Sequence, residues 1–164
     1  MHPLDRFHED HLAFRERFSA FESRLDGVVN ARRLDAPALG ALQDDLRFTR
    51  DRLLPHFHAE DETVLPAMES RLGRHGASLV GILAYEHEEL RRAVRKLEQA
   101  IGTVNLDELN RHGLFLVQVL QDHVRKEEAT FFPSARKTLG TQEWDDIEAR
   151  LDALGFGGES RPAP

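Results

Sequence analysis

The chain has 164 residues, of which 22 are Lys or Arg and 29 are Asp or Glu, so its formal net charge at pH 7 is −7. This length fits one domain, and a content of 40% hydrophobic and 31% charged residues is typical of a globular chain. The acidic balance argues against a nucleic-acid groove and against binding to an anionic membrane surface. The chain has no cysteine, which excludes disulfide bonds, thiolate metal ligands and a cysteine nucleophile.

The sequence also bears on where the protein is found. No stretch approaches the roughly 18 uninterrupted apolar residues of a membrane span. The first residues, MHPLDRFHEDH, are acidic and rich in histidine, whereas a secretory signal has basic residues followed by an apolar stretch. We therefore expect a cytoplasmic protein without a membrane association.

The spacing of apolar residues predicts five helices. In residues 4–28, apolar positions recur in alternating steps of three and four, which places them along one narrow helix face, called the seam below. Gly27 is expected to end this helix. Residues 36–72 predict a second helix with a kink or break at Pro55 and Pro66, because proline lacks an N–H group and clashes with the preceding turn. The remaining predicted helices cover residues 78–101, about 106–139, and 141–154.

Short connections fix the arrangement of these helices. Residues 73–77 would join the second helix to the third, and residues 102–105 the third to the fourth. Short connections make consecutive helices antiparallel neighbours. We predict an all-α fold, an up-down antiparallel four-helix bundle with a short fifth C-terminal helix. One domain would cover residues 1–155, and residues 156–164 would form a disordered tail.

Six polar residues interrupt the apolar seams of the four long helices. The first and third helices carry one histidine each, and the second and fourth carry a histidine followed by a glutamate four positions later. That spacing places both side chains on one helix face, one turn apart. The two His–Glu segments, HFHAEDETVLP and HVRKEEATFFP, share His, Glu, Thr and Pro at the same offsets, as an internal repeat. The six residues are His11, His56, Glu60, His87, His123 and Glu127.

This set predicts a metal site. One histidine on a seam is more often a hydrogen-bonded core residue than a ligand, but six such residues would need six separate partners. Buried carboxylates in particular cost free energy, and a bound cation removes that cost. Six ligands could occupy all the positions of one octahedrally coordinated ion, but the repeated half-sites favour two ions. One ion would take His11 and His56, the other His87 and His123, with Glu60 and Glu127 bridging. Imidazole suits Fe, Zn, Cu or Ni and carboxylate suits Mn as well, so the ligand types alone do not name the metal.

The same elements, in the same order, resemble the hemerythrin-like family, also called the HHE cation-binding domain. They are a lone His11, an HxxxE motif at 56–60, a lone His87, an HxxxE motif at 123–127 and the prolines 66 and 133. The similarity covers about residues 4–139. It implies a four-helix bundle with two non-haem iron ions, oxo- or hydroxo-bridged, on the six residues above. Members of the family bind O2, sense O2 or iron, handle NO or peroxide, or repair iron centres.

One departure from the family pattern bears on function. Oxygen-carrying members have an HxxxH pair on the third helix and an HxxxxD motif on the fourth. Here the residues four positions from His87 are Leu83 and Arg91, and the fourth helix has HxxxE. Four histidines instead of five would leave one open position on each octahedral ion, which favours reactivity over storage. The pattern is more similar to the iron-centre-repair branch, although the cysteine-bearing N-terminal segment of that branch is absent here.

Three interpretations of the function therefore stand beside one another. The first is a di-iron module that binds, senses or reacts with O2, NO or peroxide. The second is a di-iron enzyme of the peroxide-consuming or oxidase type, and the third is an iron storage or transfer protein. The sequence names no protein partner and leaves monomer and dimer open.

Further polar residues near the seams are interpreted one by one. His8, one turn before His11, either joins or orients the site or is a solvated histidine beside it. His58 and Tyr85 are expected to face away from the site, and His112 is too far along its helix to take part. Five acids are either solvated or hold ligand imidazoles through their second ring nitrogen: Asp61, Glu62, Glu86, Glu88 and Glu128.

Overall fold

The computed structural model describes residues 1–157, apart from the side chains of residues 73–78. Within that part the secondary structure is helical and contains no strand. In chain order the helices are α1 (Pro3–Ala31), α2 (Ala36–Phe48), the π-helix η1 (Thr49–Leu53), α3 (Leu54–Glu62), α4 (Val64–Gly102), α5 (Leu106–Lys126), the π-helix η2 (Glu127–Phe131), α6 (Phe132–Thr138) and α7 (Thr141–Ala153).

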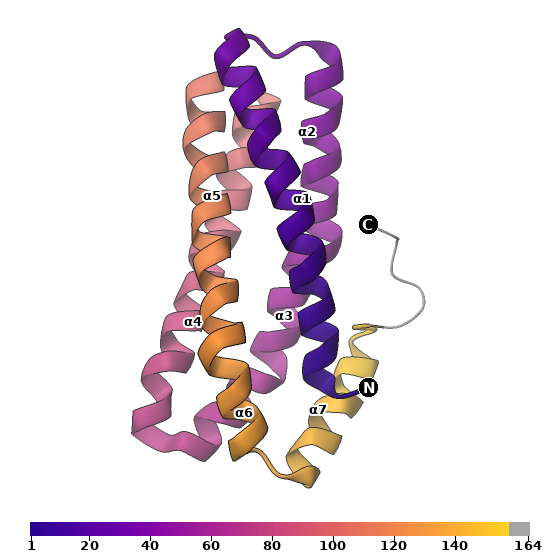
Figure 1. Ribbon diagram of the computed structural model, residues 1–164, viewed down its shortest axis with the longest axis vertical. Helices are drawn as coiled ribbons and strands as arrows, with labels where there is room; N and C mark the ends of the chain where they lie inside the picture. Colours follow the sequence, from indigo (N-terminus) through magenta and orange to yellow (C-terminus); the bar gives the residue numbers. More distant parts are fainter. Residues whose placement is uncertain (158–164) are drawn as a thin grey trace.

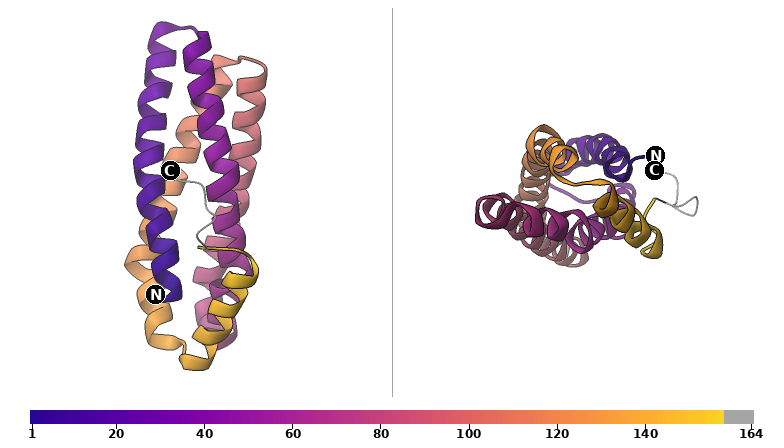
Figure 2. Two further views of the ribbon diagram at one scale, coloured as in Figure 1. Left: turned by 90° about the vertical axis from the view of Figure 1, so that its right-hand side faces the viewer. Right: turned by 90° about the horizontal axis from the view of Figure 1, so that it is seen from below.

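The helices form four antiparallel columns with a fifth helix at one end (Figure 1). The columns are α1, then α2–η1–α3, then the long part of α4, and finally α5–η2–α6. Among the helix contacts, α5 packs on both α4 and α1, and α3 packs on α4. The shorter α7 runs obliquely along the outside of the bundle near its lower end and contacts α1, as the side and end views show (Figure 2). The predicted up-down bundle with a short C-terminal helix is confirmed.

The helix boundaries differ from the prediction at two glycine-containing segments. α1 continues past Gly27 and ends where Arg32 adopts a left-handed conformation with φ of 51°. Residues 73–77, expected as a loop, lie inside α4, whose first part crosses the lower end of the bundle before the helix turns upward (Figure 1). Glycine costs only about 1 kcal/mol relative to alanine inside a helix. The packing of the flanking segments outweighs that penalty, so the chain reverses direction in a bent helix.

Prolines set the breaks in the second and fourth columns. η1 ends two residues before Pro55, and η2 ends two residues before Pro133. Because proline has no N–H, the carbonyl four residues earlier loses its α-helical partner, and the wider π-turn accommodates the ring. Before Pro66, the chain breaks at Thr63, with φ of −128° and ψ of −85°. A kink or break was predicted at Pro55 and Pro66, and the α-helix is interrupted before both, by the π-helix η1 and by the break at Thr63.

Two apolar clusters fill the bundle, one on each side of a polar layer. One contains Phe14, Phe18 and Leu90, and the other contains Phe7 and Leu83. On α1 the polar layer falls between Phe7 and Phe14, and on α4 it falls between Leu83 and Leu90. The polar layer is therefore enclosed by apolar residues from above and below.

The C-terminal end closes the lower cluster. Phe156, expected to begin a disordered tail, is buried and lies with its ring centroid 4.8 Å from that of Phe7. Arg6 donates hydrogen bonds to the Phe156 carbonyl at 3.0 Å and to Asp152 at 2.6 Å. Residues 155–157 are thus part of the folded unit, because an aromatic ring gains more by burial than the short segment loses in entropy. Residues 158–164, the rest of the expected tail, lie outside the described residues. In the described part, no helix is long and apolar enough to cross a membrane.

Candidate metal centre

The six residues predicted from the seams meet in the polar layer. They form two groups that share both glutamates, and within each group one potential ligand atom per residue lies within 4.8 Å of the others. Each of the six side chains is at most 1% exposed. The first group is His11, His56, Glu60 and Glu127, and the second is Glu60, His87, His123 and Glu127.

The histidines face one another in pairs. The Nε2 atoms of His11 and His56 are 3.1 Å apart, and those of His87 and His123 are 3.0 Å apart. Glu60 Oε1 lies 3.4 Å from Nε2 of His56, and its Oε2 lies 3.2 Å from Nε2 of His87. Each oxygen of Glu60 therefore belongs to a different histidine pair.

Glu127 repeats this arrangement from the fourth column. Its Oε2 lies 3.3 Å from Nε2 of His11, and its Oε1 lies 3.0 Å from Nε2 of His123. Both carboxylates thus extend from one histidine pair to the other. This is the geometry that two bridging carboxylates require.

Every histidine of the centre donates its other ring N–H to a carboxylate. These contacts place a proton on Nδ1, so that Nε2 is the ring atom that faces the centre and can bind a cation there. The Nδ1–oxygen distances are 2.6 Å for His11 to Glu128, 3.1 Å for His56 to Asp10, 2.7 Å for His87 to Asp61 and 2.9 Å for His123 to Glu86.

Three of these outer carboxylates are also paired with permanent cations. Arg52 contacts Asp10 at 2.8 Å, Arg91 contacts Asp61 at 2.6 Å, and Lys126 contacts Glu86. Glu128 is contacted by the exposed His8 at 3.0 Å. The ring orientations are therefore held by a second layer of charges around the centre.

Of the other residues considered from the sequence, some contact the histidines of the centre and others lie away from it. Asp61, Glu86 and Glu128 do hold imidazoles, whereas Glu62 is exposed and Glu88 pairs with Arg91. His58 is exposed, and Tyr85 is 65% exposed, both as expected. His112 pairs with Glu108, away from the centre, and the exposed His8 pairs with Glu128.

Sequence reasoning missed Asp10. This carboxylate is 1% exposed and accepts from His56 and Arg52. A signal was present, since Asp10 follows Pro3 and Phe7 and precedes Phe14 in the alternating steps of four and three that mark the buried face of α1.

Aromatic rings cover the histidines. Phe57 stacks on His87 with centroids 4.5 Å apart, and Phe132 stacks on His11 at 5.5 Å. Phe7 and Phe14 meet His56 edge-on. These rings keep water from the centre and lower the local dielectric constant, which strengthens every charge interaction inside it.

The electrostatics of the centre test whether a cation fits. None of the four oxygens of Glu60 and Glu127 accepts a well-aligned hydrogen bond from the described residues. Burial lowers the pKa of His123, but Glu127 and Glu86 outweigh this effect and raise the pKa to about 10. Burial also lowers the pKa of His11, which Glu127 and Glu128 raise to about 9. Without a cation, protons on these histidines balance the buried carboxylates, and a metal ion would replace the protons. The residues present therefore fit a cation.

The buried histidines and glutamates at the centre of this helical bundle are typical of a cation-binding protein. The chain belongs to the hemerythrin HHE cation-binding domain family, whose sequence pattern matches residues 2–135. It is also 30% identical over 107 residues to the iron-sulfur cluster repair protein DnrN of Neisseria gonorrhoeae. That match covers 65% of this chain and 65% of the relative's length. No solved structure matches the chain.

Proposed function

We propose that the six seam residues hold two iron ions and that this pair binds or reacts with O2, NO or peroxide. One observation carries the proposal. Glu60 and Glu127 each extend one oxygen to each histidine pair, and none of these oxygens has a well-aligned hydrogen-bond donor among the described residues. Four imidazoles and two carboxylates are a donor set that iron accepts readily.

The chain's own residues prepare the centre for such ligands. Asp10, Asp61, Glu86 and Glu128 hold the imidazoles in one orientation, which supports metal affinity. Phe57 and Phe132 exclude water from the histidines. A bound iron pair would supply electron exchange between its ferrous and ferric states. With four histidines and not five, the protein leaves room for a small external ligand.

Release of iron to a damaged iron centre is the second candidate function. The relative named as an iron-sulfur cluster repair protein favours it. This chain has no cysteine, so any such role would draw on the His and Glu centre alone.

Metal analysis and visible absorption of the purified protein test the first proposal. We expect about two irons per chain and the absorption of a bridged ferric pair, both lost in His56→Ala and in Glu127→Ala. His58→Ala is the matched control, since His58 lies on the same helix but is exposed. One metal ion per chain, or a colourless zinc protein, would contradict the proposal.

A second measurement separates the two candidates. For the first, the absorption of the reduced protein should change on exposure to O2, NO or peroxide. For the second, iron should leave the protein and appear in an iron-sulfur acceptor that lacks its cluster. Transfer without any spectral response to the small molecules would favour the second candidate.

A further inference from the structure

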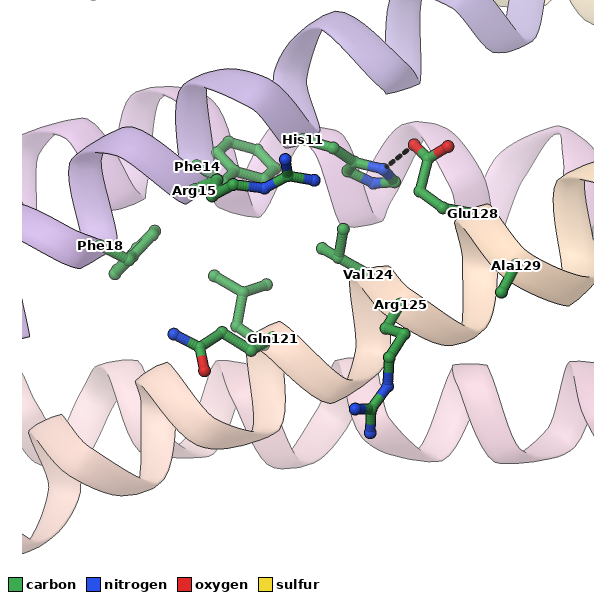
Figure 3. Close-up of a pocket in the computed structure, with 10 residues that line it drawn as sticks. His11, Phe14, Arg15, Phe18, Gln121, Val124, Arg125, Glu128 and Ala129 are labelled. Atoms are coloured by element: carbon green, nitrogen blue, oxygen red, sulfur yellow. Dashed lines mark hydrogen bonds and ion pairs between the residues drawn. The ribbon is translucent and has the colours of Figure 1, made fainter.

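A pocket of about 570 Å³ opens between α1 and α5 and reaches His11 (Figure 3). Phe14 and Phe18 form its wall on α1, and Leu120 and Val124 form its wall on α5. Its size lies within the range of about 300–1,000 Å³ that is typical of small-molecule sites. A diatomic molecule or hydrogen peroxide needs only a small fraction of this space.

The charges around the pocket are arranged unevenly. Arg15 lies along the α1 wall and extends toward His11 (Figure 3), and it has no ion-pair partner among residues 1–157 with described side chains. The second arginine of the lining, Arg125, pairs with Asp122 at 2.6 Å and points away from Arg15. The carboxylate at the end of the pocket, Glu128, is already engaged by two histidines. The guanidinium of the exposed Arg15 therefore lies at a pocket whose walls are mainly apolar, with Gln121 as a further polar residue of the lining.

We infer that this pocket binds a small organic anion that has an apolar aromatic or aliphatic body and one carboxylate-type group. The body would lie against Phe14, Leu120 and Val124, which removes apolar surface from water. The anionic group would pair with Arg15, because a guanidinium matches a carboxylate with two parallel hydrogen bonds. Of the six residues of the metal centre only His11 lines the pocket, and the proposed contacts with the ligand do not require iron to be bound.

Calorimetric titration of the full-length purified protein tests this inference with three matched probes. 2-Naphthoate has both features, acetate has the charge alone, and 2-naphthalenemethanol has the apolar body alone. We expect one 2-naphthoate per chain. Acetate should bind at least about tenfold more weakly because it buries little apolar surface. Acetate binding as tight as that of 2-naphthoate would show an anion site at the metal centre and would overturn the inference.

Variants of the pocket then locate the binding site. Arg15→Gln should weaken the binding of 2-naphthoate by about tenfold, as expected for loss of a charged hydrogen-bond pair. The affinity for 2-naphthalenemethanol should stay nearly unchanged. Arg95→Gln removes the same charge from an exposed position on α4 and is the control. Unchanged 2-naphthoate affinity in Arg15→Gln would overturn the assignment of the anchor.

Filling the pocket provides the independent test. Val124→Trp should abolish binding of both aromatic probes, and Val119→Trp should not. Both valines are half-buried on α5 and pack against the same apolar cluster, but only Val124 lines the pocket. If Val124→Trp fails to fold, Ala129→Phe fills the pocket from an exposed position on η2. Full binding in a folded, filled variant would place the ligand elsewhere and would overturn the inference.

Discussion

Asp10 shows how a single side chain outside the ligand set can govern the centre. Its two oxygens accept from His56 and from Arg52, and the carboxylate is 1% exposed. In Asp10→Asn, the charge that orients His56 and balances Arg52 is lost. We expect iron affinity to fall by about 10–100-fold, the usual effect of removing such a partner.

Competition with a chelator of known affinity measures this loss. Glu9→Gln is the matched control, because Glu9 is the exposed neighbour of Asp10 on α1. Equal iron affinity in Asp10→Asn and the parent protein would show that Asp10 does not orient the ligand.

At the residue scale, the seam residues could be predicted and their supporting partners only in part. His56 and Glu60 stand out in the sequence because their seam neighbours are almost all apolar. An acid such as Glu86 sits on a helix flank, where most acids are solvated, and only the fold brings it 2.9 Å from the ring of His123. Contacts between different columns depend on how each helix is rotated about its own axis relative to its neighbours. The spacing of residues in the sequence does not give this rotation.

At the scale of elements, Gly113 allows the close approach of α5 to α1. A Cβ at this position would lie 2.5 Å from Cδ1 of Leu25 and 3.3 Å from Cζ of Phe21. Leu25 is fully buried, so it has little room to move aside. Gly113→Ala should therefore lower the free energy of unfolding by about 1–3 kcal/mol, as for other overpacked cores.

Urea denaturation measures the effect of Gly113→Ala. Gly81→Ala is the control, because Gly81 lies inside α4 and a Cβ added there would meet nothing within 4 Å. That substitution should raise the free energy of unfolding by about 0.4–1 kcal/mol, because alanine lowers the conformational entropy of the unfolded chain. A stabilised Gly113→Ala protein would show that α1 and α5 can separate without cost.

The elements themselves could be predicted wherever apolar periodicity is strong. The prolines 55 and 66 also indicated the interruption within the second column and the break between that column and α4. The sequence does not distinguish a kink from a π-helix, since both relieve the same missing N–H. The glycines near residue 75 predicted a loop, but the bend of α4 depends on packing at the end of the bundle, which no local pattern records.

At the scale of the whole molecule, the C-terminal segment closes the lower end of the bundle. The Phe156 ring lies 6.0 Å from the ring of His56 as well as against Phe7. Phe156→Ala should lower the free energy of unfolding by about 3 kcal/mol, the usual cost of truncating a buried phenylalanine. Chemical denaturation tests this against Leu154→Ala, where the side chain is 41% exposed. That control should change the free energy of unfolding by less than about 0.5 kcal/mol.

Removal of the metal should weaken the entire fold, because the centre joins all four columns. A ligand that binds only the folded chain adds about 4 kcal/mol when its concentration is 1,000 times its dissociation constant. For a domain of this length each kcal/mol corresponds to about 2–4 °C in melting temperature. Chelation should thus lower the melting temperature by about 8–16 °C, and adding ferrous iron back without oxygen should restore it.

The double variant His56→Ala/Glu127→Ala separates this effect from any direct action of the chelator. It removes two residues of the first metal-site group and one of the second, because Glu127 belongs to both groups. Chelator and iron should therefore leave its melting temperature unchanged. If the parent protein melts at the same temperature with and without metal, the buried charges of Glu60 and Glu127 are balanced by the protein alone. In that case the protons on His11 and His123 are sufficient to hold the four columns together.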